Sequence, residues 1–259
     1  MKLTFLGTGT SVGVPQMRCD CPVCKSVDPR DKRLRTSALI TLADSRNILI
    51  DCGPDLRQQL LSVGCPDIAA MFITHIHYDH VGGIDDMRPY CHEITDGHFP
   101  VYCLPDVADD LRDRIPYCFA THPYPGVPTF RLIEIAPDKT FDIGGNVVAT
   151  PLPVMHYRLP IIGFRIGKLS YITDCKTMPD STLELIKGSD TLVINALRHK
   201  PHPAHMNLSD ALGVIEKAAP RKAYLTHLSH DMGFYAEVSA QLPENVEIAY
   251  DGLQIDIPD

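Results

Sequence analysis

Short runs of apolar and β-branched residues recur along the chain, and segments with a helical spacing of apolar residues lie between them. Such runs predict β-strands, and their alternation with helices is typical of an α/β fold. We expect strands at residues 2–7, 37–43, 47–53, 70–75, 100–104, 130–136, 146–156, 163–167, 168–174, 191–197, 222–227, 247–250 and 253–257. We expect helices at residues 55–64, 107–115, 181–188, 208–219 and 234–242. The pattern contains no internal repeat or linker, so residues 1–259 are expected to form a single domain.

Composition and charge narrow the classes of function. The 259 residues are 44% hydrophobic, which is ordinary for a globular protein. The chain has 24 Lys and Arg against 32 Asp and Glu, a formal net charge of −8, so large nucleic acid is not an expected partner. No apolar run approaches the roughly 18 residues of a membrane helix, and the first residues lack the pattern of a signal peptide. We therefore expect a cytoplasmic protein without a membrane partner, and a homodimer stays an open alternative to a monomer.

Four predicted strands end in residues that commonly bind metal ions. Threonine precedes His75, Asp174 and His227 at three of these ends, and the run "PLPVM" leads into His156. In α/β folds the carboxyl ends of strands meet at one edge of the sheet, where loops converge on a shared crevice. Residues that are distant in sequence are therefore expected to form one cluster.

The stretch "ITHIHYDHVGG", residues 73–83, is the richest in ligand-type side chains. Two imidazoles at alternate positions after a strand can face one ion, and residues beyond the next turn can face a neighbouring ion. The expected ligands are His75, His77 and His156 for a first ion, Asp79, His80 and His227 for a second, and Asp174 as a bridge between them. Nitrogen and carboxylate ligands without thiolate suit Zn, Mn, Fe, Co or Ni. We expect two divalent active-site ions, Mn or Zn first, with Ni or Fe as alternatives.

The stretch "THIHYDHVGG" resembles the signature T-H-x-H-x-D-H of the metallo-β-lactamase superfamily. His156, Asp174 and His227 also follow in the order in which that superfamily places its remaining ligands. The resemblance implies an αβ/βα four-layer sandwich with a dinuclear hydrolytic site at one edge. It says little about the substrate, because one fold carries many activities.

A second set of ligand candidates lies near the start of the chain. Cys19, Cys21 and Cys24 form C-x-C-x-x-C, which suits three corners of a tetrahedral zinc ion. His230, three residues after His227, is the expected fourth ligand. Nine cysteines fit a disulfide framework poorly, so the alternative is a set of buried free thiols. We expect one structural zinc ion here.

The cysteine motif and the stretch "THLSH" together resemble the phosphoribosyl 1,2-cyclic phosphate phosphodiesterase branch (PhnP-like) of the superfamily. That branch has a catalytic histidine just before a helix, and His205 in "AHMNLSDAL" matches this position. We expect Asn207 or Ser209 to cap the helix. The resemblance implies a small phosphodiester substrate, opened by a hydroxide that the metal ions activate. Asp79 would orient the hydroxide, and His205 would bind a phosphoryl oxygen or protonate the leaving oxygen.

Other assignments stay open. A thioester or lactone hydrolase or a tRNA-trimming nuclease would share the metal site, and a non-hydrolytic protein similar to the pyrroloquinoline quinone biosynthesis member would share the cysteine motif. Arg35 and Arg88 could reach a phosphate or could form salt bridges. His199 and His202 also precede the helix, have no assigned role and are expected to be loop residues.

Overall fold

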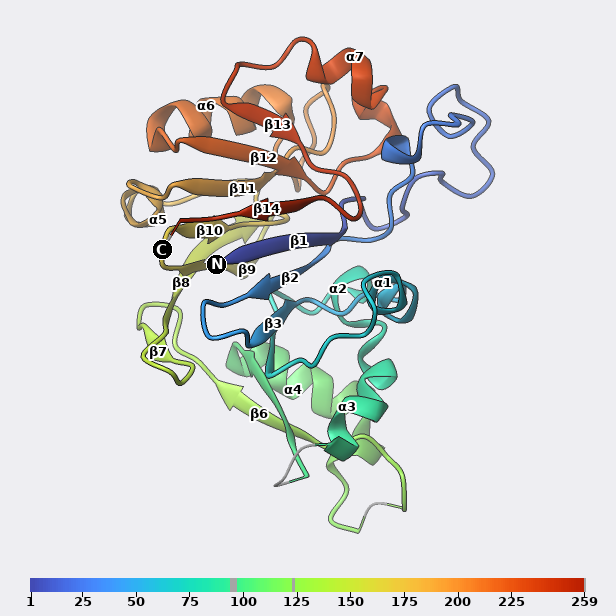
Figure 1. Cartoon of the computed structure of the whole chain (residues 1–259), viewed down its shortest axis with the longest axis vertical. Helices are drawn as coiled ribbons and strands as arrows, with labels where there is room; N and C mark the ends of the chain where they lie inside the picture. Colours follow the sequence, from blue (N-terminus) through green and yellow to red (C-terminus); the bar gives the residue numbers. More distant parts are fainter. Residues whose placement is uncertain (94–96, 123, 259) are drawn as a thin grey trace.

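The structure, a computed structural model, describes residues 1–93, 97–122 and 124–258 and contains two seven-stranded sheets packed face to face (Figure 1). The first sheet has the order β14 (Gln254–Asp256), β1 (Lys2–Gly7), β2 (Ser37–Thr41), β3 (Asn47–Ile50), β4 (Ala70–Phe72), β5 (Phe99–Cys103) and β6 (Phe130–Glu134). The second has the order β13 (Val246–Ile248), β12 (Lys222–Thr226), β11 (Thr191–Asn195), β10 (Leu169–Tyr171), β9 (Leu159–Ile166), β8 (Val148–His156) and β7 (Phe141–Asp142). The predicted α/β class is confirmed.

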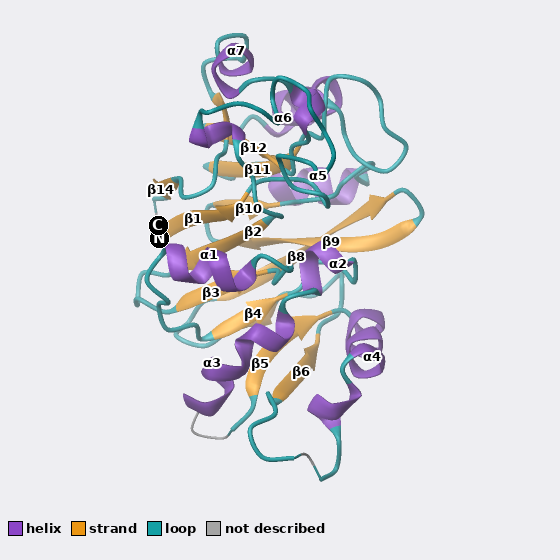
Figure 2. Cartoon of the chain, turned by 90° about the vertical axis from the view of Figure 1, so that its right-hand side faces the viewer, coloured by secondary structure: helices purple, strands orange, loops and turns teal. Residues whose placement is uncertain are grey.

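Helices cover the outer face of each sheet (Figure 2). On the first sheet, α1 (Leu56–Ser62) contacts β1 and α4 (Pro105–Arg114) contacts β6. On the second, α5 (Asp180–Ile186) contacts β8 and α6 (Leu208–Ala218) contacts β11. The remaining helical segments are α2 (Tyr78–Val81), α3 (Arg88–Glu93), α7 (Tyr235–Ser239) and the 3-10 helices η1 (Pro29–Asp31), η2 (Ile84–Met87), η3 (Pro116–Phe119) and η4 (His230–Met232). This order of helix, sheet, sheet and helix confirms the four-layer sandwich.

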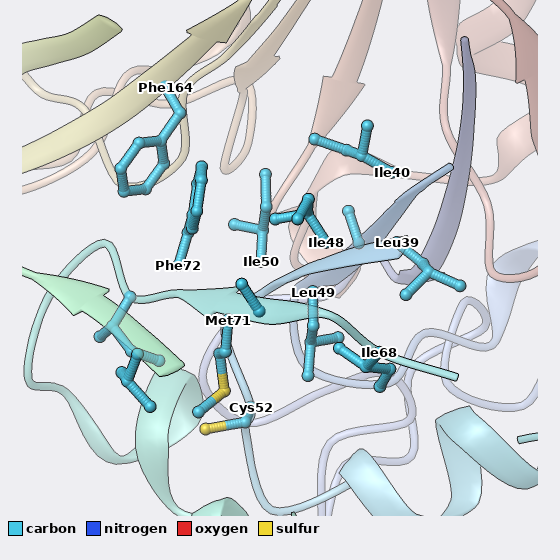
Figure 3. Close-up of a cluster of buried hydrophobic side chains, with 14 of the residues drawn as sticks. Leu39, Ile40, Ile48, Leu49, Ile50, Cys52, Ile68, Met71, Phe72 and Phe164 are labelled. Atoms are coloured by element: carbon cyan, nitrogen blue, oxygen red, sulfur yellow. The ribbon is translucent and has the colours of Figure 1, made fainter. Parts of the chain in front are cut away.

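The inner strands are buried on both faces, which is why they have continuous apolar sequences. Figure 3 shows that Ile48 and Ile50 of β3 point toward Phe164 of the second sheet, whereas Leu49 between them points to the opposite side. Successive residues of a strand face opposite ways, so one strand contributes to two layers. The rings of Phe72 and Phe164, from different sheets, have centroids 4.8 Å apart. The core between the sheets holds the strand ends in fixed positions.

Every predicted strand overlaps an observed strand, but several predictions extend too far, and three of them end three residues too late. The chain leaves the first sheet after Ile50 and after Phe72, and it leaves the second sheet after Tyr171. Asp51 and Asp174, which follow two of these strands closely, have φ values of 59° and 55°. A backbone with positive φ cannot continue a strand. The positive φ of Asp51 therefore ends β3, and that of Asp174 prevents an extended backbone from continuing past Thr173.

The sequence pattern does not predict β7, α2 or α3. β7 has two residues and α2 has four, and segments this short contain no periodicity to detect. The cap of α6 is Asn207 and not Ser209. The Asn207 side chain accepts a hydrogen bond of 2.8 Å from the Asp210 backbone N–H, and the Asp210 carboxylate accepts one from the Asn207 backbone N–H. This cap fixes the start of α6 directly after the loop that carries His205.

Within the described ranges, no helix combines the length and the apolar character needed to span a membrane.

Candidate metal centre

The carboxyl ends of the central strands bring seven predicted ligands together, and we call them the His–Asp cluster. They form two groups, His75, His77 and His156 in the first and Asp79, His80, Asp174 and His227 in the second. Within each group, one ligand atom of every residue lies within 4.8 Å of the others. His77 is exposed, whereas the four residues of the second group are buried. The first group therefore opens to solvent and the second lies deeper.

Asp174 lies between the two groups. Its Oδ2 is 3.9 Å from Nε2 of His75 in the first group, and its Oδ1 is 3.3 Å from Nε2 of His80 in the second. One carboxylate can thus present one oxygen to each group. This is the geometry that a bridging ligand requires, and the bridging role stays a proposal.

The cluster fits divalent cations because it contains buried nitrogen atoms without partners. Nε2 of His75, His80 and His227 is buried in each case and has no hydrogen-bond partner. A buried polar atom without a partner costs roughly 1–3 kcal/mol, and native proteins rarely leave one. Three such atoms beside two carboxylates match the imidazole and carboxylate donors of a transition-metal site.

Hydrogen bonds outside the cluster orient the histidines. Nδ1 of His80 donates to Asp51 Oδ2 over 2.7 Å, and Nδ1 of His75 donates to Thr74 Oγ1 over 3.0 Å. Thr74 in turn donates through its N–H and its Oγ1 to Asp51, over 2.8 Å and 2.9 Å. With Nδ1 acting as the donor, Nε2 of both rings is left for a metal ion. Asp51 is not among the predicted site residues, because the predicted strand 47–53 includes it, although it follows an apolar run as the ligands do.

Two glycines allow α2 to pack against the end of β3. The backbone N–H of Cys52 donates to His80 O over 2.7 Å, and the N–H of Gly83 donates to Cys52 O over 2.8 Å. A Cβ atom at Gly53 would collide with the backbone oxygen of Asp79, and one at Gly83 would collide with that of Gly53. The glycines of "HVGG" and "DCG" therefore permit the close backbone contact that places Asp79 and His80.

The charges of the cluster shift its pKa values. Burial and the charge of His80 lower the pKa of His75, which favours the neutral imidazole that binds metals. Burial alone would raise the pKa of Asp174, but the charges of His227 and His80 outweigh it and lower this pKa well below its usual value. These shifts favour a neutral His75 beside an ionised Asp174 at neutral pH, which are the forms that coordinate cations. At His80 burial alone would lower the pKa, but the charges of Asp174 and Asp79 outweigh it and raise this pKa, so binding of a cation there would displace a proton.

The predicted catalytic residue His205 lies at the edge of the cluster. Its Nδ1 is buried, lacks a hydrogen-bond partner and is 3.7 Å from Asp174 Oδ2. Burial and the nearby charge of His227 lower its pKa to about 3. One ligand atom of His205 also lies within 4.8 Å of ligand atoms of His156 and Asp174. The geometry therefore allows a ligand role as well as the predicted catalytic role.

Cys19, Cys21, Cys24 and His230 form a second group, which we call the Cys–His cluster. Nδ1 of His230 is 3.3 Å from Cys19 Sγ and 3.2 Å from Cys21 Sγ. The hydrogen bond from His230 lowers the pKa of Cys21 to about 6, whereas burial raises that of Cys24 to about 11. In Figure 1, the loop between β1 and β2, which carries the cysteines, projects beside α7. The cluster thus joins the first connection of the chain to the segment after β12.

Other candidates have local partners. Arg35 forms an ion pair of 2.9 Å with Asp55, and Arg88 forms one of 3.0 Å with Asp85, so both arginines take the salt-bridge alternative. His199 Nε2 donates to Met232 O over 2.9 Å, in agreement with the predicted role of a loop residue. His202 lies closer to the cluster than expected, and its ring centroid is 5.1 Å from that of His205.

Comparison with known proteins identifies the family. A family model described as "Beta-lactamase superfamily domain" matches residues 46–228, which include every residue of the His–Asp cluster. The chain belongs to the beta-lactamase superfamily. The fold of this superfamily implies divalent metal ions, in agreement with the unpartnered nitrogen atoms of the cluster.

Several known proteins resemble this superfamily member over nearly its whole length. A Porphyromonas gingivalis protein named octanoyltransferase is 42% identical over 255 residues, which are 98% of this chain and 51% of that protein. The chain thus spans about half the length of that relative. Coenzyme PQQ synthesis protein B of Pseudomonas fluorescens is 25% identical, with 99% of this chain and 100% of that protein covered. The crystal structure of a diphosphatase from the PhnP family is 37% identical with a TM-score of 0.91, covering 99% of this chain and 98% of that one.

Proposed function

We propose that this protein is a metal-dependent hydrolase of small phosphate esters, and that it opens a cyclic phosphodiester of the phosphoribosyl 1,2-cyclic phosphate type. The observation that carries the proposal is the position of His205 against Asp174 in a complete His–Asp cluster. A histidine beside a carboxylate that would bind ions of both groups is placed to meet a phosphoryl group. The likeness to a diphosphatase of the PhnP family supports phosphate chemistry.

In this proposal the protein residues divide the work. Divalent ions at such a site lower the pKa of water and neutralise charge on phosphate oxygens. The carboxylates of Asp79 and Asp174 would orient the hydroxide that attacks phosphorus. Because all four residues of the second group are buried, bulk water is excluded from that part of the site. His205 holds a phosphoryl oxygen through its N–H. Because its pKa of about 3 keeps the imidazole neutral at pH 7, it gives a proton to the departing sugar oxygen only if the negative phosphate raises this pKa on binding. The product is a phosphomonoester.

An assay panel tests the proposal. The purified chain would be loaded with Mn, Zn or Ni and given a cyclic phosphate, a diphosphate, a bis-aryl phosphate, a thioester and a lactone. We expect the cyclic phosphate to be hydrolysed with the highest kcat/KM. A preference for the diphosphate would support hydrolysis at phosphorus but would contradict the cyclic phosphodiester as the substrate class. Turnover of the thioester or lactone alone would overturn the proposal.

A second candidate function is hydrolysis of an acyl thioester. A groove of about 420 Å³ lies beside the end of β8, next in sequence to His156. Its lining is mostly apolar and includes Val154, Met155, Ile161, Ile162 and Met178. Such a groove suits a hydrocarbon chain. A relative named octanoyltransferase is matched over only 51% of its length, so the groove is the observation that carries this candidate. If the groove holds an acyl chain, Met178→Asp should lower hydrolysis of an octanoyl thioester and leave an acetyl thioester unaffected.

A non-hydrolytic role is the third alternative, supported by the likeness to coenzyme PQQ synthesis protein B. The complete His–Asp cluster favours hydrolysis over this alternative. Absence of turnover across the whole panel, in protein with a full metal content, would favour the non-hydrolytic role.

A further inference from the structure

The loop between β11 and α6 has a fixed base and carries three histidines. The backbone N–H of Leu197 donates to Met206 O over 2.9 Å, and that of Leu208 donates to Arg198 O over 3.0 Å. The N–H of Met206 donates to Cys175 O over 2.8 Å, directly after the candidate ligand Asp174. The ends of the loop are therefore tied to each other and to the strand end that carries Asp174.

Ala204 in this loop connects two histidine rings. Its backbone N–H donates to His202 Nδ1 over 3.2 Å, and its carbonyl oxygen accepts a hydrogen bond of 2.9 Å from His156 Nδ1. His202 stands between Pro201 and Pro203, and a residue before proline is restricted to extended backbone. The ring of His202 thus holds Ala204 at one side, and Ala204 holds His156 at the other.

The bond from His156 to Ala204 determines which nitrogen of His156 faces the cluster. Because Nδ1 carries the proton that it donates to Ala204 O, Nε2 is left for the first group with His75 and His77. Backbone carbonyls commonly orient metal-binding histidines in this way, and losing such a partner lowers metal affinity by about 10- to 100-fold. His156 is therefore sensitive to the position of Ala204.

We propose that His202 is a positioning residue for the metal site of the first group, and that it acts on His156 through Ala204. This inference rests on the proposed metal centre but not on any particular substrate. Removing the Nδ1 acceptor of His202 releases the Ala204 N–H and loosens the carbonyl that orients His156. The effect is confined to the first group, because the second group takes its orientation from Asp51 and from the ends of other strands.

The test compares three variants of His202. In His202→Asn, the side-chain oxygen can occupy the place of Nδ1 and accept from Ala204. In His202→Phe the ring remains without an acceptor, and in His202→Gln the oxygen extends beyond the place of Nδ1. Each variant of the full chain is loaded with zinc, exposed to increasing chelator and analysed for zinc per chain, with circular dichroism to verify folding. Lys200→Ala, an exposed change in the same loop, is the matched control.

We expect the Phe and Gln variants to lose one active-site zinc at about 10-fold lower chelator concentration, and the Asn and Lys200 variants to match the wild type. Unchanged retention in the folded Phe or Gln variant would overturn the proposal. Equal loss in the Asn variant would also overturn it, because the ring would then act through another atom. Metal retention is measured without substrate, so failure of the proposed phosphodiesterase activity leaves the test intact.

Discussion

Nδ1 of His80 lies 2.7 Å from Oδ2 of Asp51, and neither side chain is exposed to solvent. The Asp51 carboxylate also accepts two hydrogen bonds from Thr74, so three donors converge on it. A carboxylate accepts at both oxygens, whereas an amide accepts at only one. Asp51 therefore links the end of β3, the end of β4 and α2. It orients the candidate ligand His80 and is not itself a candidate ligand.

Asp51→Asn should weaken the second metal group through His80 and, less directly, the first group through Thr74 and His75. The amide nitrogen would meet at least one of the three donors without an acceptor, which costs about 1–3 kcal/mol for a buried group. We expect metal affinity about 10- to 100-fold lower and a lower midpoint of urea unfolding. Metal analysis and urea titration measure the two effects. Asp138→Asn, at an exposed position, is the control, and equal metal affinity in both variants would contradict the orienting role.

Asp174→Ala should remove the residue shared by both groups. Because its two oxygens face His75 and His80, the loss should lower the content of both active-site ions, not of one. We expect hydrolytic activity to be abolished while the zinc of the Cys–His cluster stays bound. Metal analysis of the folded variant decides between the outcomes. Retention of one full equivalent of active-site metal with wild-type affinity would exclude the bridging role.

The strand ends explain how much of the site is predictable from sequence. Apolar runs followed by threonine and a ligand-type residue predict where His75, Asp174 and His227 lie, because buried parallel strands must deliver their carboxyl ends to one edge. The contribution of Ala204 is different. Its carbonyl oxygen belongs to every residue type, so no side chain in the sequence marks the hydrogen bond to His156. Likewise, the end of β3 before Asp51 depends on a left-handed backbone that apolar periodicity does not encode.

His205→Ala should lower the rate of phosphodiester hydrolysis by about 10²- to 10⁴-fold, the usual range for a lost general acid. Metal content should not change if His205 acts on the substrate. The defect should shrink for a bis-aryl phosphate, because an aryl oxide leaves without needing a proton. Parallel kinetics with the cyclic phosphate and the aryl ester measure this difference. Loss of metal in the variant would instead assign His205 as a ligand, as its grouping with His156 and Asp174 allows.

The Cys–His cluster should hold a zinc ion that stabilises the fold and takes no part in hydrolysis. Three thiolates and one imidazole close a tetrahedron, so no position is left for water or substrate. Backbone N–H groups of Gln16 and Cys24 donate to Cys24 Sγ and Cys21 Sγ, both over 3.4 Å. Such bonds favour a thiolate, and the pKa of Cys21 is indeed lowered, whereas burial outweighs them at Cys24 and raises its pKa. We therefore expect one zinc ion to resist a mild chelator that strips the active-site ions.

Cys21→Ser should lose this zinc and lower the melting temperature, because the loop after β1 would no longer be tied to η4 through His230. His230→Ala should lose the same ion, since it removes the ligand from the other end of the tie. Folded protein of both variants should keep measurable hydrolysis after active-site metal is restored, because none of the four residues belongs to the His–Asp cluster. Cys65→Ser, an exposed cysteine outside the cluster, should keep the zinc and serves as the control. Wild-type zinc content in both Cys21→Ser and His230→Ala would mean that the cluster is a set of free thiols, and the case for a PhnP-like enzyme would lose its most specific support.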